Sequence, residues 1–331
     1  MSTIGNNLPT LQDHARMLNP GGKIDKIVEL LGRTNEILTD MVYVEGNLPT
    51  GHLSTIRTGL PEVAWRLLNY GVPNGKAETA QVTDTCGMLE AYAEVDKRVA
   101  SLNGNTSEFR LSQDKAFVEA MNQAMASTIF YGDTRTNPER FLGLAPRFSD
   151  AVNAGNKEQL VNGGGTGSVN TSVWLVVWSP ETVHGIFPKG TTAGLDHQNL
   201  GEVTLFDAAG NKFQGYRSHY EWHNGLVVAD WRYVVRICNI DVDNLISGTG
   251  AADLVKLMIR ASEIPPALGM GRAVWYCNRT VRTALREQIL AKSNVNLTWD
   301  NVAGKKVLAF DEIPVRRCDA ILSTESAISF S

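Results

Sequence analysis

Cysteine is scarce in this sequence, with four residues among 331. The four lie far apart and form no CxxC pair, which excludes a zinc ribbon and a thioredoxin-type redox motif. We therefore expect four reduced thiols in or near the core and assign no metal site. They are Cys86, Cys238, Cys277 and Cys318.

Long apolar runs and an excess of positive charge are also missing. No stretch reaches the roughly 20 apolar residues of a membrane helix. The N-terminal MSTIGNNLPT lacks the basic start and apolar segment of a signal peptide. The formal net charge is −4 and the basic residues are scattered, so we expect no membrane partner, no sequence-specific DNA binding and synthesis in the cytoplasm.

A nucleotide-binding loop is missing as well, although the stretch VNGGGTGSVNTSVWLVVW raises the question. A Walker A loop needs a lysine after its last glycine, whereas Gly167 is followed by Ser168 and Val169. A dinucleotide loop follows a strand and opens a helix, but this one precedes a predicted strand. A nucleotide-dependent enzyme using Gly163 to Ser168 stays the alternative from another class, and a flexible joint is our preferred interpretation of the glycines.

No catalytic constellation stands out elsewhere. His219 and His223 in HYEWH have the spacing of a helical zinc site, but the alternation of SHYEWHNGLVV favours a strand. In a strand the two side chains lie about 13 Å apart, too far to share a metal. No GxSxG nucleophile elbow occurs. We assign no catalytic, cofactor-binding or metal-binding residue and expect a protein that is not an enzyme.

What the sequence does contain is a long predicted hairpin over residues 52–96. STIRTGLPEVAWRLLNY and AETAQVTDTCGMLEAYAEV are rich in β-formers, and they flank GVPNGK, which favours a turn. Strands of about 15 residues would reach roughly 50 Å, beyond a single domain. Because a free two-stranded ribbon is marginal alone, we expect a neighbouring subunit to cover it, with Arg57, Trp65 and Arg66 as candidate contacts.

The remaining pattern predicts an α+β fold with segregated helices and strands. Near-helical spacing between Ile24 and Ile37 indicates one short helix in an N-terminal arm. We expect a long helix from Ser112 to Tyr131, capped by Ser112 and carrying one apolar stripe, a buried strand at SVWLVVW, turns at AAGNK and HNG, helices over 253–261 and 280–292, and closing strands around Asp311 and Pro314.

The segment DWRYVVRICNIDV is predicted to be a strand with Arg232 and Arg236 on one face and apolar residues on the other. A solvated sheet face is the commonest explanation for such charges. Ion pairs between subunits are the second, so Arg232 and Arg236 complete our candidate contacts.

Several phrases together resemble one family over nearly the whole chain: GNLPTGHLSTIRTGLPEVAWRLLNYGV, DTCGMLEAYAEVD, FYGDTRTNPERFLGLAPRF, SVWLVVWSPETVHGIFPKG, DWRYVVRICNIDV, YCNRTVRTALREQI and IPVRRCDAILSTE. They resemble the major capsid proteins of short-tailed, double-stranded DNA phages related to epsilon-fifteen. The resemblance implies an HK-ninety-seven-type fold, whose connectivity is permuted in some relatives. It divides the chain into an N-terminal arm (1–48), an extended E-loop (49–97), a peripheral part with the spine helix (98–150), and an axial domain with the remaining peripheral strands (151–331).

The resemblance also implies a function. Such chains form the pentamers and hexamers of an icosahedral head that encloses double-stranded DNA. The implied partners are further copies of the chain, a separate scaffolding protein, a portal, a decoration or cement protein, and DNA met only non-specifically. We expect the virion as the location, after assembly in the bacterial host's cytoplasm, and we assign no cofactor and no crosslink to Lys76. An encapsulin-like compartment is the related alternative.

Overall fold

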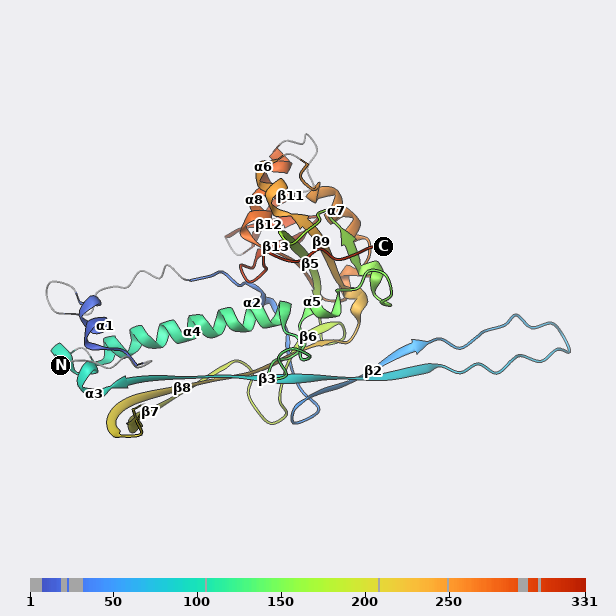
Figure 1. The fold of residues 1–331 in the computed structure, drawn as a ribbon. Helices are drawn as coiled ribbons and strands as arrows, with labels where there is room; N and C mark the ends of the chain where they lie inside the picture. The colour runs from blue at the N-terminus through green and yellow to red at the C-terminus, as the bar shows by residue number, and fades with distance from the viewer. Residues whose placement is uncertain are drawn as a thin grey trace. The chain divides into compact units, whose positions relative to one another are not determined.

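The computed structural model describes residues 8–18, 23, 32–104, 106–207, 209–248, 250–290, 297–302 and 305–331. The chain divides into two compact units, each built from separate segments. Unit 1 comprises Met1–Arg33, Met88–Met125 and Gly194–His223, and unit 2 comprises Thr34–Gly87, Ala126–Ala193 and Asn224–Ser331. The predicted α+β class is confirmed (Figure 1). The four consecutive parts expected from the sequence stay a prediction.

Helices and strands alternate irregularly along the chain. The α-helices are α1 Leu11–Arg16, α2 Ile37–Asp40, α3 Lys97–Ala100, α4 Thr106–Tyr131, α5 Leu144–Arg147, α6 Val242–Ser247, α7 Leu254–Ser262 and α8 Arg279–Leu290. Short 3-10 turns are η1 Leu102–Gly104, η2 Lys157–Gln159, η3 Trp231–Tyr233 and η4 Leu268–Met270. The strands are β1 Tyr43–Glu45, β2 Gly51–Gly59, β3 Glu78–Asp96, β4 Leu160–Asn162, β5 Asn170–Trp178, β6 Val183–Phe187, β7 Leu195–Phe206, β8 Lys212–Val228, β9 Val234–Asp241, β10 Arg272–Cys277, β11 Leu297–Val302, β12 Lys305–Phe310 and β13 Ile313–Arg317.

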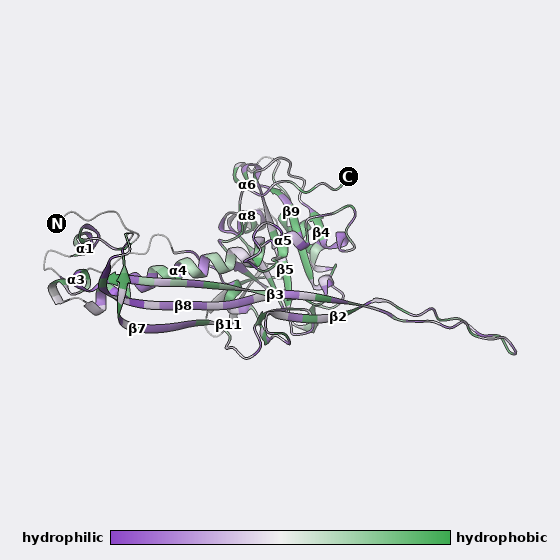
Figure 2. Ribbon diagram, turned by 60° about the horizontal axis from the view of Figure 1, so that its bottom comes forward, coloured by the Kyte–Doolittle hydropathy of each residue, from purple (hydrophilic) through white to green (hydrophobic). Residues whose placement is uncertain are grey.

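The core of unit 2 is organised around β5, which contains the predicted SVWLVVW strand. β5 pairs antiparallel with β9 on one side and with β10 on the other, and all nine of its residues are buried. Both faces of such a central strand need apolar side chains, which explains a continuous run rather than an alternating one. Figure 2 shows the apolar colouring of β5 and β9. Helices α6, α7 and α8 bury their apolar faces in the same core, which includes Leu245, Leu257 and Leu285.

The glycine-rich loop lies between β4 and β5 and runs beside β9. The amides of Gly163 and Gly165 donate to the carbonyls of Cys238 and Asn239 at 2.8 and 2.6 Å. A Cβ at Gly163 would lie 2.8 Å from the Asn239 carbonyl oxygen, and one at Gly165 would lie 2.3 Å from the Asn170 side chain.

Two other glycines of the loop, Gly164 and Gly167, have φ of 88° and 86°, the left-handed region that glycine tolerates. At each of these four positions, a close contact or a positive φ explains why the residue is glycine. Because the loop leads into a strand, a phosphate cradle is wrong. A flexible joint stays a prediction.

Unit 1 is built from α1, α3, β7 and parts of α4, β3 and β8. β7 and β8 form a hairpin whose turn is the predicted AAGNK, where the Asp207 carboxylate accepts hydrogen bonds from the amides of Ala209 and Asn211. The HYEWH segment lies within β8, as predicted, and His219 stacks on Tyr92. In the described part of the chain, no group of three or more His, Cys, Asp or Glu side chains is arranged to hold a metal ion.

Three expectations need correction. The long helix begins at Thr106, and Ser112 lies inside it, where its hydroxyl donates to the Phe109 carbonyl at 2.9 Å rather than capping the end. The predicted apolar stripe is only partly buried, because Val118 and Ala124 are exposed. The HNG sequence is not a turn but part of β8, where Gly225 allows the Thr85 carbonyl to approach closely.

The other helix predictions have mixed outcomes. The helix starting near Asp253 is confirmed as α7, with the Asp253 carboxylate capping its first turn, and the next as α8. Residues 24–31 of the predicted N-terminal helix lie outside the described residues. Among those described, no helix is long and apolar enough to cross a membrane.

Candidate subunit interface

The predicted long hairpin exists, but it forms a regular ladder only over residues 51–59 and 78–85, here called the hairpin root. β2 and β3 pair antiparallel from Gly51 opposite Thr85 to Gly59 opposite Glu78, with an irregularity between Arg57 and Gly59. The ladder ends just before Pro61, which has no amide hydrogen to donate. Pro73 removes a second donor on the returning limb. Figure 1 shows the two limbs continuing outward beyond the ladder.

Residues 60–77, here called the hairpin tip, reverse at a turn that the sequence did not predict. The Tyr70 amide donates to the Leu67 carbonyl at 3.2 Å, and Asn69 adopts a positive φ of 68°. Asparagine tolerates this conformation better than most residues. A Cβ at Gly75 would lie 2.7 Å from the Glu62 carbonyl oxygen, so the two limbs face each other. The predicted turn at GVPNGK is therefore wrong.

The hairpin tip carries the densest set of exposed apolar side chains in the described chain. Trp65 is fully exposed, and its neighbours are between about half and nine-tenths exposed. They are Leu60, Val63, Leu67, Leu68, Tyr70 and Val72. Exposed apolar side chains gathered in one short segment in this way indicate an interaction site.

A groove at the root of the hairpin brings together two predicted contacts. It has a volume of about 700 Å³ and is lined by residues 55–60, Glu181 and residues 229–232, which include Arg57 and Arg232. Arg232 is held by Asp230 at 2.7 Å, and this pairing raises the pKa of Arg232. Arg57 is exposed and forms no ion pair within the described part of the chain. Trp65 and Arg66 lie on the hairpin tip instead.

Arg236 does not lie on an exposed face and is withdrawn as a subunit contact. The η3 turn interrupts the expected strand, so Arg232 precedes β9 while Arg236 lies inside it, buried on all sides. Its guanidinium binds Glu325 at 2.9 Å, the Ser172 hydroxyl at 3.0 Å and a main-chain carbonyl, and it lies over the Trp174 ring. Arg236 therefore does not lie on a solvated sheet face, because these partners pair its charge and its hydrogen-bond donors within the subunit.

Glu325 is a structural residue that the sequence did not reveal. Its buried carboxylate also accepts hydrogen bonds from the hydroxyls of Tyr131 and Ser172. Its backbone exchanges two hydrogen bonds with Asn170 at the start of β5. Burial raises the pKa of Tyr131 well above its usual value. The arrangement fastens the C-terminal segment onto the core of unit 2.

A second buried polar cluster lies at the hairpin root in unit 2. Asp84 on β3 pairs with Arg147 at 2.6 Å, and both side chains are largely buried. The rings of His52 and His184 meet edge to face with centroids 5.7 Å apart. Burial, followed by repulsion from His52, lowers the pKa of His184 to about 4. Single residues far apart in the sequence form this cluster, so no motif predicted it.

A mixed sheet with a buried central strand carries a long hairpin with an exposed apolar tip, and comparisons with known proteins specify the class of protein. A family model described as "Major capsid protein GP7" matches residues 19–329. A solved structure of bacteriophage Epsilon15 is 37% identical, covers 99% of each chain and has a TM-score of 0.79. The bacteriophage JBD30 capsid is 10% identical and covers 88% of this chain and 93% of its own, with a TM-score of 0.48. No curated protein sequence matches.

The family match and the Epsilon15 match define the chain as a phage capsid subunit with the HK-ninety-seven-type fold. It belongs to the major capsid protein GP7 family. It is therefore a structural, non-enzymatic protein that assembles with copies of itself into the shell of a virion. The alternative function, a nucleotide-dependent enzyme that uses the glycine loop, is therefore wrong.

Proposed function

We propose that the chain forms the pentamers and hexamers of an icosahedral head that encloses double-stranded DNA, and that the hairpin tip is the arm that binds a neighbouring copy. The observation that carries this proposal is the fully exposed Trp65 among six other exposed apolar side chains. A single subunit gains nothing from leaving them in water. A neighbour that covers them recovers the hydrophobic free energy.

The free energies of burial and of association suit reversible assembly. Burying three large apolar side chains contributes about 5 to 9 kcal/mol. Association itself costs about 4 to 15 kcal/mol in lost freedom of motion. One hairpin contact alone is therefore weak. Many such contacts, made in a closed shell, hold each subunit firmly while early errors can still dissociate.

The finer partners follow from the family rather than from any one side chain. We propose a separate scaffolding protein, a portal, a decoration or cement protein, and assembly in the bacterial host's cytoplasm. Contact with the packaged DNA is proposed to be non-specific, in keeping with a net charge of −4. Arg57 and Arg232, on the root groove, and Arg66, on the hairpin tip, stay proposed contacts between subunits.

The test is Trp65→Ala in a shell-assembly assay with the scaffold present. Because the indole is fully exposed in the subunit, we expect the free energy of unfolding to change by less than about 0.5 kcal/mol. We expect the yield of closed shells to fall at least about tenfold, since an aromatic anchor is lost at each contact. Shells are counted by electron microscopy of gradient fractions, and stability is measured by urea unfolding of the soluble subunit.

The matched control is Phe206→Ala, which removes an exposed aromatic side chain from β7 rather than from the hairpin. Its shells should form as those of the parent do. Equal losses of soluble subunit and of shells in Trp65→Ala would contradict the proposal, since the residue would then act in folding.

A further inference from the structure

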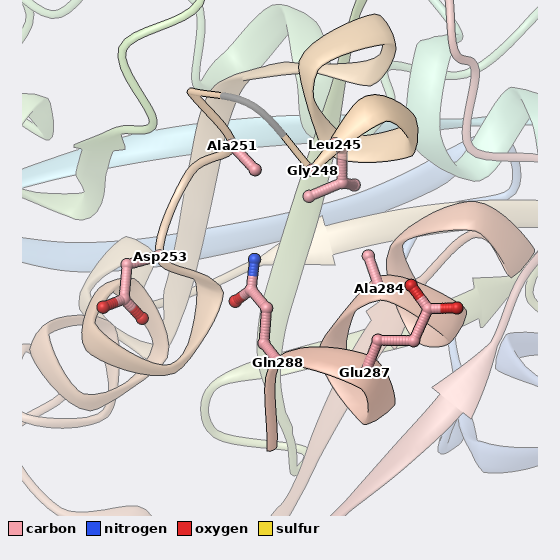
Figure 3. Close-up of a pocket in the computed structure, with 7 residues that line it drawn as sticks. All are labelled: Leu245, Gly248, Ala251, Asp253, Ala284, Glu287 and Gln288. Carbon is pink, nitrogen blue, oxygen red and sulfur yellow. The ribbon is translucent and has the colours of Figure 1, made fainter. Parts of the chain in front are cut away.

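A pocket of about 480 Å³ lies among α6, α7 and α8 in unit 2 (Figure 3). Its apolar part is formed by Leu245, Ala251 and Ala284. Figure 3 shows Glu287 and Gln288 projecting from α8, with Asp253 at the start of α7. The pocket therefore combines an apolar floor with carboxylates at its edge.

The polar side chains of the pocket are not equally engaged. Gln288 joins α8 to the start of α7: its Nε2 donates to the Ala252 carbonyl at 2.8 Å, and its Oε1 accepts from the Leu254 amide at 2.9 Å. Asp253 caps α7 and pairs with Lys256 at 3.4 Å. The side chain of Glu287 is exposed and forms no hydrogen bond or ion pair with any described residue.

A carboxylate beside an apolar floor suits an arginine side chain. The aliphatic stem of arginine packs on apolar surface while its guanidinium forms two parallel hydrogen bonds with a carboxylate. The ligand expected from the pocket's chemistry is thus a cationic side chain with a long stem.

Arginines of this kind lie on another side of the same helix. Arg279, Arg282 and Arg286 follow one another at spacings of three and four residues, so they share one side of α8. Val281 and Leu285 lie on a different, buried side of α8. At 3.6 residues per turn, Glu287 points about 140° away from Arg282 around the helix. Arg282 forms no ion pair with a described residue, and this direction keeps it from reaching Glu287 of its own chain.

We propose that Arg282 of one copy inserts into the Glu287 pocket of the next copy around the capsomer. The proposal rests on the proposed function, because it requires rings of identical subunits. A ring contact joins two different surfaces of the same subunit, and a complementary pair must therefore exist on every copy. The Glu287 pocket and the side of α8 that carries Arg282 form such a complementary pair. Charge complementarity of this kind fixes the register between neighbours more than it adds affinity.

The experiment is a charge exchange in the full chain, assembled with its scaffold. Glu287→Arg and Arg282→Glu each place like charges at every contact, and each should lower the yield of closed shells at least about tenfold, which corresponds to about 1.4 kcal/mol. The double variant restores opposite charges in the reverse order and should return the yield to within about threefold of the parent. The controls are Arg260→Glu and Glu263→Arg, exposed residues at the end of α7 outside the pocket, which should assemble normally.

The outcomes separate this inference from its rivals. Normal shells from both single variants, or a double variant no better than the worse single one, would overturn it. Normal Arg282→Glu shells that hold less DNA would also overturn it, because the arginines would then face nucleic acid. Thermal unfolding of each soluble variant excludes loss of folding. If Trp65→Ala abolishes shells while Glu287→Arg does not, only the pocket contact fails and the proposed function stands.

Discussion

The hairpin tip and β5 are both apolar segments built around tryptophan, yet they have opposite surroundings. Trp174 and Trp178 on β5 are fully buried, whereas Trp65 on the hairpin tip is fully exposed. β5 has a hydrogen-bonded neighbour on each side, while no ladder forms in the hairpin tip. Apolar content thus predicts that a segment is to be buried. The strands beside β5 allow its own chain to bury it, whereas the hairpin tip lacks such strands and is proposed to be buried by another copy.

The largest effect should come from the β5 side of this comparison. Trp174→Ala leaves a cavity in the core and removes the ring under the Arg236 guanidinium. We expect it to lower the free energy of unfolding by about 4 kcal/mol and to reduce the soluble yield. Urea unfolding of the subunit measures the loss. A Trp174→Ala subunit as stable as Trp65→Ala would remove the distinction between the two regions.

The next largest effect should come from the buried ion pair behind β5. Arg236→Met leaves the Glu325 carboxylate buried without its cation, which we expect to cost about 3 kcal/mol in the free energy of unfolding. Adding Glu325→Gln removes the unpaired charge and should recover part of that loss. A double variant as unstable as Arg236→Met, measured by the same urea unfolding, would show that packing rather than charge is responsible.

The smallest effect concerns pH and the root of the hairpin. Burial holds the pKa of His184 near 4, below its usual 6.5, so the unfolded chain takes up a proton before the folded one does. Stability should be constant above about pH 6.5 and fall as the pH drops towards about 4. The groups facing the ring are His52, Asp84 with its partner Arg147, and the Ser179 backbone.

Thermal unfolding at a series of pH values measures this dependence. His184→Gln should flatten the fall between about pH 6.5 and 4, because the titrating group is gone. An unchanged pH dependence in His184→Gln would assign the fall to other groups.

Local patterns predicted local elements well. The β5 strand, the helix α7 and the AAGNK turn were all predicted, because each depends on residues that are neighbours in the sequence. The hairpin itself was predicted, but its turn was placed wrongly at GVPNGK, which has good turn residues. The ladder pairs Gly59 with Glu78, so two limbs of equal length meet at Leu68 and Asn69, where the chain reverses. The predicted turn at HNG was wrong because Gly225 allows a close contact between strands and does not form a turn.

Sites that depend on distant partners could not be predicted. Arg236 was taken for a surface charge because its partner Glu325 lies 89 residues away. Nothing in the sequence near Glu325 indicates a buried carboxylate, and the His52 and His184 pair has no spacing to recognise. Arg57 and Trp65 stay predicted contacts; they were chosen from the sequence because an overlong hairpin is itself a local signal.

Cryo-electron microscopy of the assembled shell tests the central claim most directly, since it shows what surrounds the hairpin tip. We predict that Trp65 and most of the other exposed apolar side chains of residues 60–72 are buried against another copy of the chain in every capsomer. A map in which Trp65 stays in solvent, or folds back onto its own subunit, would contradict the claim.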